Sequence, residues 1–144
     1  MKLGFFNEFV PGVIVGDQVV DVSAAVSHLK QSSPQLLMSE IIARFEELRP
    51  ALERAARGGG VPLSRVRLRP PLPSPQKILC LMGGYMEGVE NGVRKGVDMF
   101  LKASSSVIGD GDTIVLPEAK CPIFHHEAEL GLVMDGGRSD IAFW

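Results

Sequence analysis

Short apolar runs near the N-terminus predict a small antiparallel sheet. Residues 3–6, 13–15 and 18–22 form three such runs, and Gly16-Asp17 lies between the second and the third. Glycine supplies the positive φ that a tight hairpin turn requires, so the second and third runs predict a β-hairpin.

A helical pattern follows this hairpin. Ser23 is expected to cap a short helix that ends at residue 30. Apolar residues then recur at helical spacing from residue 35 to residue 57, which predicts a helix with one packed face and one solvated, charged face. Pro50 should kink this helix or start a second one there, and glycines 58–60 end it.

Four prolines fall within residues 70–75. Closely spaced prolines favour a stiff, extended segment, so we expect a connector between two domains here. The predicted organisation is a small N-terminal domain over residues 1–69, the proline connector over 70–75, and a second domain from residue 76 to residue 144.

The second domain is predicted to consist mainly of strands. Residues 77–82 are continuously apolar, as expected for a strand that is buried on both faces. Residues 86–96 are rich in glycine and polar side chains and predict a loop, and residues 99–102 predict a strand. Residues 109–112 predict a turn that leads into a strand over 113–116. The fold class is therefore mixed, β-rich α+β.

Alternation of polar and apolar residues is clearest between residues 124 and 133. In a strand, His125, Glu127 and Glu129 would share one face, with the two glutamate Cα atoms ~7 Å apart. Their oxygens could converge on a hard cation such as Mg²⁺, Mn²⁺ or Ca²⁺. His125 would lie ~13 Å from Glu129, too far to share that ion. A half-buried strand with solvated acids is the alternative interpretation.

Composition and charge exclude several classes of protein. The chain has 144 residues, 45% hydrophobic and 22% charged, and a formal net charge of −2, which is typical of a soluble globular protein. No basic stripe suited to nucleic acid is found, and no apolar run approaches the ~20 residues that span a bilayer. The two cysteines, Cys80 and Cys121, lie in apolar settings, as expected of reduced side chains in a cytoplasmic protein.

Other motifs carry weaker signals. Gly83-Gly84 lacks the remaining residues of a nucleotide-binding loop, and Asp110 with Asp112 lacks the full calcium-loop pattern. Tyr85 and Lys102 each follow a predicted strand and precede a loop, where binding side chains often lie.

The order of these segments resembles that of the fumarylacetoacetate hydrolase superfamily, over roughly residues 61–141. The resemblance rests on the proline connector followed by an apolar strand, Tyr85, the strand ending at Lys102, the turn at 109–112, and the His-His-Glu-Ala-Glu segment at 125–129. It implies a catalytic domain of mixed, barrel-like β-structure that is usually homodimeric. It also implies a Mg²⁺ or Mn²⁺ ion that holds a 2-oxo or diketo acid for C–C cleavage, decarboxylation or isomerisation.

The same resemblance assigns roles to four residues. Glu127 and Glu129 would be two of three carboxylate ligands of the metal, Lys102 would contact the substrate's charge, and Tyr85 would line the pocket. The cation would act as a Lewis acid that stabilises an enolate.

Two departures from the family pattern bear on catalysis. Where hydrolytic members carry an Asn-Tyr pair and a His three residues later, this sequence has Gly84, Tyr85 and Gly88, so Glu87 or Glu90 would have to replace the base. The third metal carboxylate would lie beyond residue 144. An apolar ending after Ser139-Asp140, a pair typical of a helix N-cap, suggests a chain cut short.

Three functions are therefore compatible with the sequence. The chain could be part of a metal-dependent hydrolase or lyase, a non-catalytic association module that pairs through open sheet edges, or a structural domain in which both glutamates are solvated.

Overall fold

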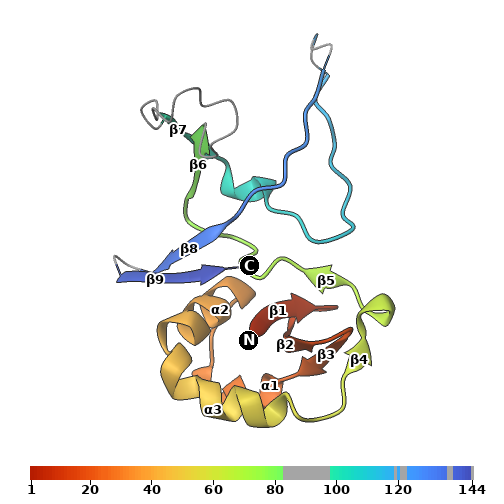
Figure 1. The fold of residues 1–144 in the computed structure, drawn as a ribbon, viewed down its shortest axis with the longest axis vertical. Coiled ribbons are helices and arrows are strands. Elements are labelled where there is room, and N and C mark those ends of the chain that lie inside the picture. The colour runs from red at the N-terminus through yellow and green to blue at the C-terminus, as the bar shows by residue number, and fades with distance from the viewer. Residues whose placement is uncertain (83–97, 119, 121–122, 136–137, 144) are drawn as a thin grey trace, which may run out of the picture.

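The computed structural model describes residues 1–82, 98–118, 120, 123–135 and 138–143. Figure 1 shows an elongated molecule with the N-terminal strands and helices at one end and the hairpin of β6 (Ile78–Met82) and β7 (Asp98–Lys102) at the other. A second hairpin, β8 (Leu132–Asp135) and β9 (Arg138–Phe143), lies between them, and β8 contacts α2 (Pro34–Ala43). The predicted mixed, β-rich α+β class is confirmed.

The N-terminal sheet is antiparallel and curled into a half-barrel, with the strand order β4-β3-β2-β1-β5. The hairpin predicted around Gly16 is confirmed, because β2 pairs with β3 and Gly16 has a φ of +60°. The strands are β1 (Lys2–Phe6), β2 (Val10–Val15), β3 (Gln18–Asp21), β4 (Val61–Pro62) and β5 (Leu68–Arg69).

Three helices cover one face of this sheet (Figure 1): α1 (Ser23–Val26), which continues as a 3₁₀ turn over Ser27–Leu29, α2 (Pro34–Ala43) and α3 (Phe45–Ala55). The prediction that Ser23 caps the first helix is wrong. Val22 holds the cap position, and the Ser23 N–H donates a 2.8 Å hydrogen bond to Asp21 Oδ1. Asp21 thus supplies the acceptor that a capping side chain usually provides.

The expectation that a second helix starts at Pro50 is also wrong. The break lies at Arg44, whose φ of −111° leaves the helical region, and Pro50 is inside α3. The Arg44 guanidinium pairs with Glu40 on one helix and Glu47 on the other. A proline inside a helix forfeits a single N–H bond of its own, and the packing of Leu48 and Leu52 on either side of it keeps α3 continuous.

The hydrophobic core lies between these helices and the sheet. Among the described residues, every buried hydrophobic side chain belongs to residues 3–52. The most deeply buried are Phe5, Met38, Ile41 and Leu52, each with almost no exposed surface. The N-terminal end of the molecule therefore has a closed core of its own.

The proline segment lies against this core instead of standing free in solvent. Leu72 packs against the buried cluster, and the Ser74 N–H donates a 2.9 Å hydrogen bond to Gln35 Oε1 of α2. No described helix or strand falls within residues 70–75. The domain boundary placed there stays a prediction.

Beyond the connector, two hairpins replace a continuous sheet. Strand β6 (Ile78–Met82) pairs with β7 (Asp98–Lys102), and β8 (Leu132–Asp135) pairs with β9 (Arg138–Phe143), in both cases antiparallel. The strands expected at 77–82 and 99–102 are thus confirmed. The burial expected for the first is wrong, since Leu79, Leu81 and Met82 are more than half exposed.

Three further predictions in this part are wrong. Residues 113–116 and 124–131 lie outside any strand, and Ser139-Asp140 lies inside β9 instead of opening a helix. An alternating pattern gains stability only when its apolar face is covered. Here Val115 is 85% exposed and Phe124 is also exposed, so the described residues provide no such cover.

Candidate functional site

The structure places the predicted substrate residues only in part. Tyr85 lies outside the described residues, as do Gly84, Gly88 and the candidate bases Glu87 and Glu90. Lys102 is the last residue of β7 and is exposed. Its Nζ lies 5.9 Å from the centroid of the Phe100 ring, because side chains two apart in a strand share a face. This cation–π contact holds the ammonium at the end of the strand.

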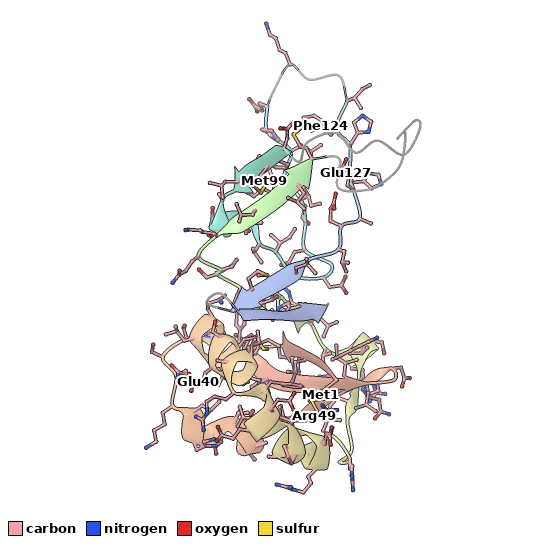
Figure 2. The ribbon with its side chains drawn as sticks, turned by 60° about the vertical axis from the view of Figure 1, so that its left-hand side comes forward. Met1, Glu40, Arg49, Met99, Phe124 and Glu127 are labelled. Atoms are coloured by element: carbon pink, nitrogen blue, oxygen red, sulfur yellow. The ribbon has the colours of Figure 1, made fainter. Side chains whose placement is uncertain are left out.

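The two predicted metal ligands lie on an irregular segment. Glu127 and Glu129 are both exposed, and neither belongs to a strand. Figure 2 shows Glu127 on this segment, in the half of the molecule that also holds Met99 of β7. The geometry that a strand would have given them, side by side on one face, is absent from this structure.

The carboxylates suit a hard cation in their chemistry and not in their arrangement. Mg²⁺ and Mn²⁺ favour carboxylate oxygens, which both glutamates offer. Within the part of the chain that the structure describes, no three His, Cys, Asp or Glu side chains are grouped closely enough to hold an ion. The described residues therefore do not form a metal site in this arrangement.

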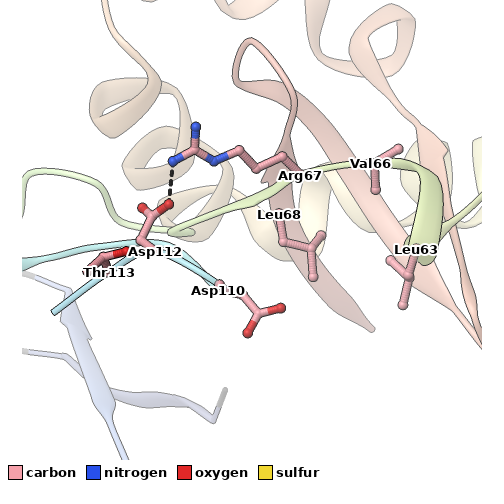
Figure 3. A pocket seen from close by; sticks show the side chains of 8 residues that line it. Leu63, Val66, Arg67, Leu68, Asp110, Asp112 and Thr113 are labelled. Atoms are coloured by element: carbon pink, nitrogen blue, oxygen red, sulfur yellow. Dashed lines mark hydrogen bonds and ion pairs between the residues drawn. The ribbon is translucent and has the colours of Figure 1, made fainter.

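The cavity shown in Figure 3 lies elsewhere, where the N-terminal sheet meets the second part of the chain. Its volume is about 630 Å³, and its walls come from two segments, residues 63–68 and 110–113. Among the predicted site residues that the structure describes, Lys102, Glu127 and Glu129, none lines it. Its charged groups are Arg67, Asp110 and Asp112.

An ion pair closes one side of this cavity. The Arg67 guanidinium donates to Asp112 Oδ1, and Asp112 Oδ2 accepts a 2.8 Å hydrogen bond from the Gly109 N–H. Asp112 in turn donates its own N–H to the Gly109 carbonyl, which confirms the turn predicted at 109–112. The pKa of the Asp112 carboxyl is lowered, first by the hydrogen bond from Arg67 and then by that from Gly109.

The turn at 109–112 packs closely on β5, an edge strand of the N-terminal sheet. A Cβ at Gly109 would lie 3.0 Å from the Leu68 carbonyl oxygen and 3.3 Å from Pro70 Cδ. A second, largely apolar cavity of about 490 Å³ adjoins it, lined by β1, the proline segment and residues 107–110. The sequence predicts the turn at 109–112 and carries no local signal that it docks on Arg67.

No described helix has the length and apolar character needed to cross a membrane. The described part of the chain comprises a half-barrel with its own core, a docked turn, and a carboxylate-bearing segment between the two hairpins.

The chain is homologous to hydrolases of the fumarylacetoacetate hydrolase superfamily, as the order of its segments indicates. Within that superfamily the similarity is to maleylpyruvate hydrolases. The chain is 30% identical to the maleylpyruvate hydrolase of Aquipseudomonas alcaligenes over 154 aligned residues, which cover 93% of this chain and 52% of the relative.

Solved structures agree with this relationship. Maleylpyruvate hydrolase from Sphingobium sp. SYK-6, determined with manganese(II) ion and pyruvate, matches with a TM-score of 0.67 and 33% identity, over 83% of this chain and 43% of that one. Another structure of the Sphingobium enzyme matches with the same TM-score and 34% identity, over 83% of this chain and 44% of that one. No family model matches the sequence. The chain spans about half the length of the relatives it matches.

Proposed function

We propose that this chain belongs to a divalent-metal-dependent enzyme that hydrolyses a C–C bond in a small 2-oxo or diketo acid. The observation that carries this proposal is the similarity, over 93% of the chain, to a maleylpyruvate hydrolase. The Sphingobium relative was solved with manganese(II) and pyruvate, an oxo acid, which supports both the cation and the substrate class.

In this proposal Glu127 and Glu129 supply two carboxylate ligands to Mg²⁺ or Mn²⁺. The cation, when bound, supplies Lewis-acid polarisation of the oxo group. Lys102 offers a positive charge to the substrate carboxylate, and its contact with Phe100 limits the directions in which the ammonium can point. Tyr85 would line the same pocket.

Two carboxylates alone make a weak site. Mg²⁺ usually keeps several waters beside one or two carboxylates, and Ca²⁺ takes six to eight oxygen ligands. The two exposed glutamates therefore need further ligands from water or from protein before a substrate can be held rigidly. Without them, the association module remains the alternative function, since it requires the exposed strands and no cation.

Manganese binding tests this proposal directly. Titration of the purified chain with Mn²⁺, followed by water-proton relaxation, should show a weak site that Glu127→Gln or Glu129→Gln weakens and the double variant abolishes. Glu118→Gln is the matched control, because Glu118 is a nearby exposed carboxylate outside the predicted site. Unchanged binding in the double variant would refute the assignment of these two ligands and favour the association module.

A further inference from the structure

The turn between β1 and β2 has an unusual backbone conformation. Asn7 and Phe9 both lie in the left-handed region, with φ of +49° and +58°. Asparagine tolerates this region, whereas a bulky residue such as phenylalanine rarely adopts it. Strained conformations of this kind persist only where the surrounding structure fixes them. The contacts around residues 7–9 must therefore hold this turn in place.

Three hydrogen bonds join Asn7 to residues 67 and 69. Its N–H donates to the Arg67 carbonyl at 2.8 Å, and its Oδ1 accepts from the Arg67 N–H at 3.1 Å. Its carbonyl oxygen accepts from Arg69 Nε at 2.7 Å. The N–H, the carbonyl and the side chain of Asn7 thus all bind the segment that forms one edge of the half-barrel.

Phe9 is held by two aromatic contacts. Its ring meets the ring of the completely buried Phe5 edge-on, with the two centroids 5.8 Å apart. The guanidinium carbon of Arg69 lies 5.3 Å from the centroid of the Phe9 ring, which is a cation–π contact. The Arg69 side chain is only 19% exposed. Arg69 therefore contacts both left-handed residues of the turn.

The same edge segment also holds the turn at 109–112. The Arg67 guanidinium donates to Asp112 Oδ1 (Figure 3). Gly109 lies so close to this segment that an added Cβ would be 3.0 Å from the Leu68 carbonyl oxygen. Strand β5 has only two residues and, among the described strands, pairs with β1 alone. A strand this short has few ladder hydrogen bonds, so its position depends on the two turns that bind it.

We infer that the β1–β2 turn, β5 and the turn at 109–112 act together as a conformational clasp. Asn7 fixes the backbone of Arg67, and that backbone sets where the guanidinium meets Asp112. Conversely, the pair with Asp112 holds Arg67 where its N–H and carbonyl bind Asn7. Opening either end of the clasp therefore loosens the other end. The ion pair also closes one side of the cavity of about 630 Å³, so an open clasp changes the shape of that cavity.

Backbone amide exchange, followed by NMR on the purified chain, tests this coupling. Asp112→Asn keeps an acceptor for the Gly109 N–H and removes the charge that binds Arg67. We expect the N–H groups of Asn7 and Arg67 to exchange at least about threefold faster in this variant. Asp110→Asn is the matched control, because Asp110 belongs to the same turn and takes no part in the Arg67 pair. It should leave both amides unchanged.

The reverse experiment changes Asn7 and follows the other turn. Asn7→Ala removes the side-chain acceptor and places alanine at a positive φ, so the Gly109 and Asp112 N–H groups should exchange at least about threefold faster. Asn7→Gly removes the same acceptor without backbone strain, so its effect should be smaller. The Leu63 N–H, which binds the Asp17 carbonyl at the β2–β3 turn, reports on the rest of the sheet and should not change.

Salt provides a second measurement that needs no substitution. Raising NaCl from about 0.05 M to about 1 M screens a partly exposed ion pair. The Asn7 and Arg67 amides should then exchange faster in the parent chain and not in Asp112→Asn.

Three results would overturn the inference. The first is exchange at Asn7 and Arg67 that Asp112→Asn leaves unchanged, because the packing of Phe9 would then fix the turn by itself. The second is an effect in one direction only, since coupling between two sites is reciprocal. The third is an equal acceleration at Leu63, which would mean that the whole sheet is loosened. None of these readouts involves metal or turnover, so they are separate from the test of the proposed function.

Discussion

The guanidinium of Arg67 pairs with the carboxylate of Asp112, 45 residues further along the chain. The Arg67 backbone is itself fixed to the turn between β1 and β2. Its N–H donates to Asn7 Oδ1 at 3.1 Å, and its carbonyl accepts from the Asn7 N–H at 2.8 Å. The turn at 109–112 is therefore tied through one arginine to the edge of the N-terminal half-barrel.

We expect Asp112→Asn to loosen this connection in a pH-dependent way. The pKa of Asp112 is lowered in the folded chain, so its contribution to stability is fully present above the unfolded pKa of about 3.9 and is lost as pH falls through the lower folded value. At neutral pH the variant should melt about 1–3 °C lower than the parent, as expected for a partly exposed ion pair. The two melting temperatures should converge as pH falls below the unfolded pKa and through the lower folded value.

Asp110→Asn is the control for this experiment. Asp110 lines the same cavity and takes no part in the Arg67 pair. The asparagine at position 112 can still accept from the Gly109 N–H, so the comparison isolates the charge. Equal melting temperatures for parent and Asp112→Asn at neutral pH would show that the ion pair contributes nothing to stability.

Alanine substitutions at two paired glycines test the packing of the half-barrel. Gly4 of β1 and Gly12 of β2 face each other across the strands. A Cβ at Gly12 would meet Val19 Cγ2 at 2.5 Å, and Val19 is a buried, β-branched side chain that cannot move aside freely. Gly12→Ala should lower the free energy of unfolding by about 1–3 kcal/mol, measured by urea denaturation.

Gly4→Ala provides the matched comparison. Nothing lies within 4 Å of a Cβ built at Gly4, so this variant should change stability by less than about 0.5 kcal/mol. If Gly4→Ala and Gly12→Ala lowered the free energy of unfolding equally, the destabilisation would come from the backbone and not from contact with Val19.

The core under α3 should respond strongly to truncation. Leu52 is completely buried, in contact with the cluster between the helices and the sheet. Leu52→Ala should cost about 2–5 kcal/mol in urea denaturation, because it removes apolar contacts and leaves a cavity. Leu36→Ala, on the exposed side of α2, should stay within about 0.5 kcal/mol. A small effect at Leu52 would contradict the closed core described for this end of the molecule.

Sequence reasoning succeeded where the structure is local and self-contained. The hairpin around Gly16 follows from a turn residue between two apolar runs, and the turn at 109–112 follows from its glycines and aspartates. It failed in placing the start of a second helix at Pro50, where a proline is tolerated because Leu48 and Leu52 anchor the helix on both sides. Tertiary packing there outweighs the local preference of one residue.

The predictions for the candidate site failed because its structure depends on contacts between distant parts of the chain. The alternation from residue 124 to residue 133 predicts a strand, yet β8 begins only at Leu132. A strand needs a partner edge and a covered apolar face, and neither is encoded in the segment itself. Nor does the sequence near Arg67 indicate Asp112 as its partner, since the two meet only when the turn docks on the sheet.

The last prediction concerns turnover. We expect the chain alone, supplied with Mn²⁺, to consume oxaloacetate or acylpyruvate at no more than about 1% of the rate of a full-length maleylpyruvate hydrolase. Stabilising an enolate requires a cation held in a well-defined position, and an error of about 1 Å can cost ~100-fold in rate. Glu127 and Glu129 are exposed and lie on an irregular segment, and the described His, Cys, Asp and Glu side chains do not group around them to fix an ion to that accuracy.

The measurement should include Glu129→Ala, which should remove any residual metal-dependent turnover. Light scattering on the same samples shows which species is active. Metal-dependent turnover by a monomer of the chain alone, lost in Glu129→Ala, would contradict this prediction. It would mean that Mn²⁺ binding itself orders the segment around Glu127 and Glu129.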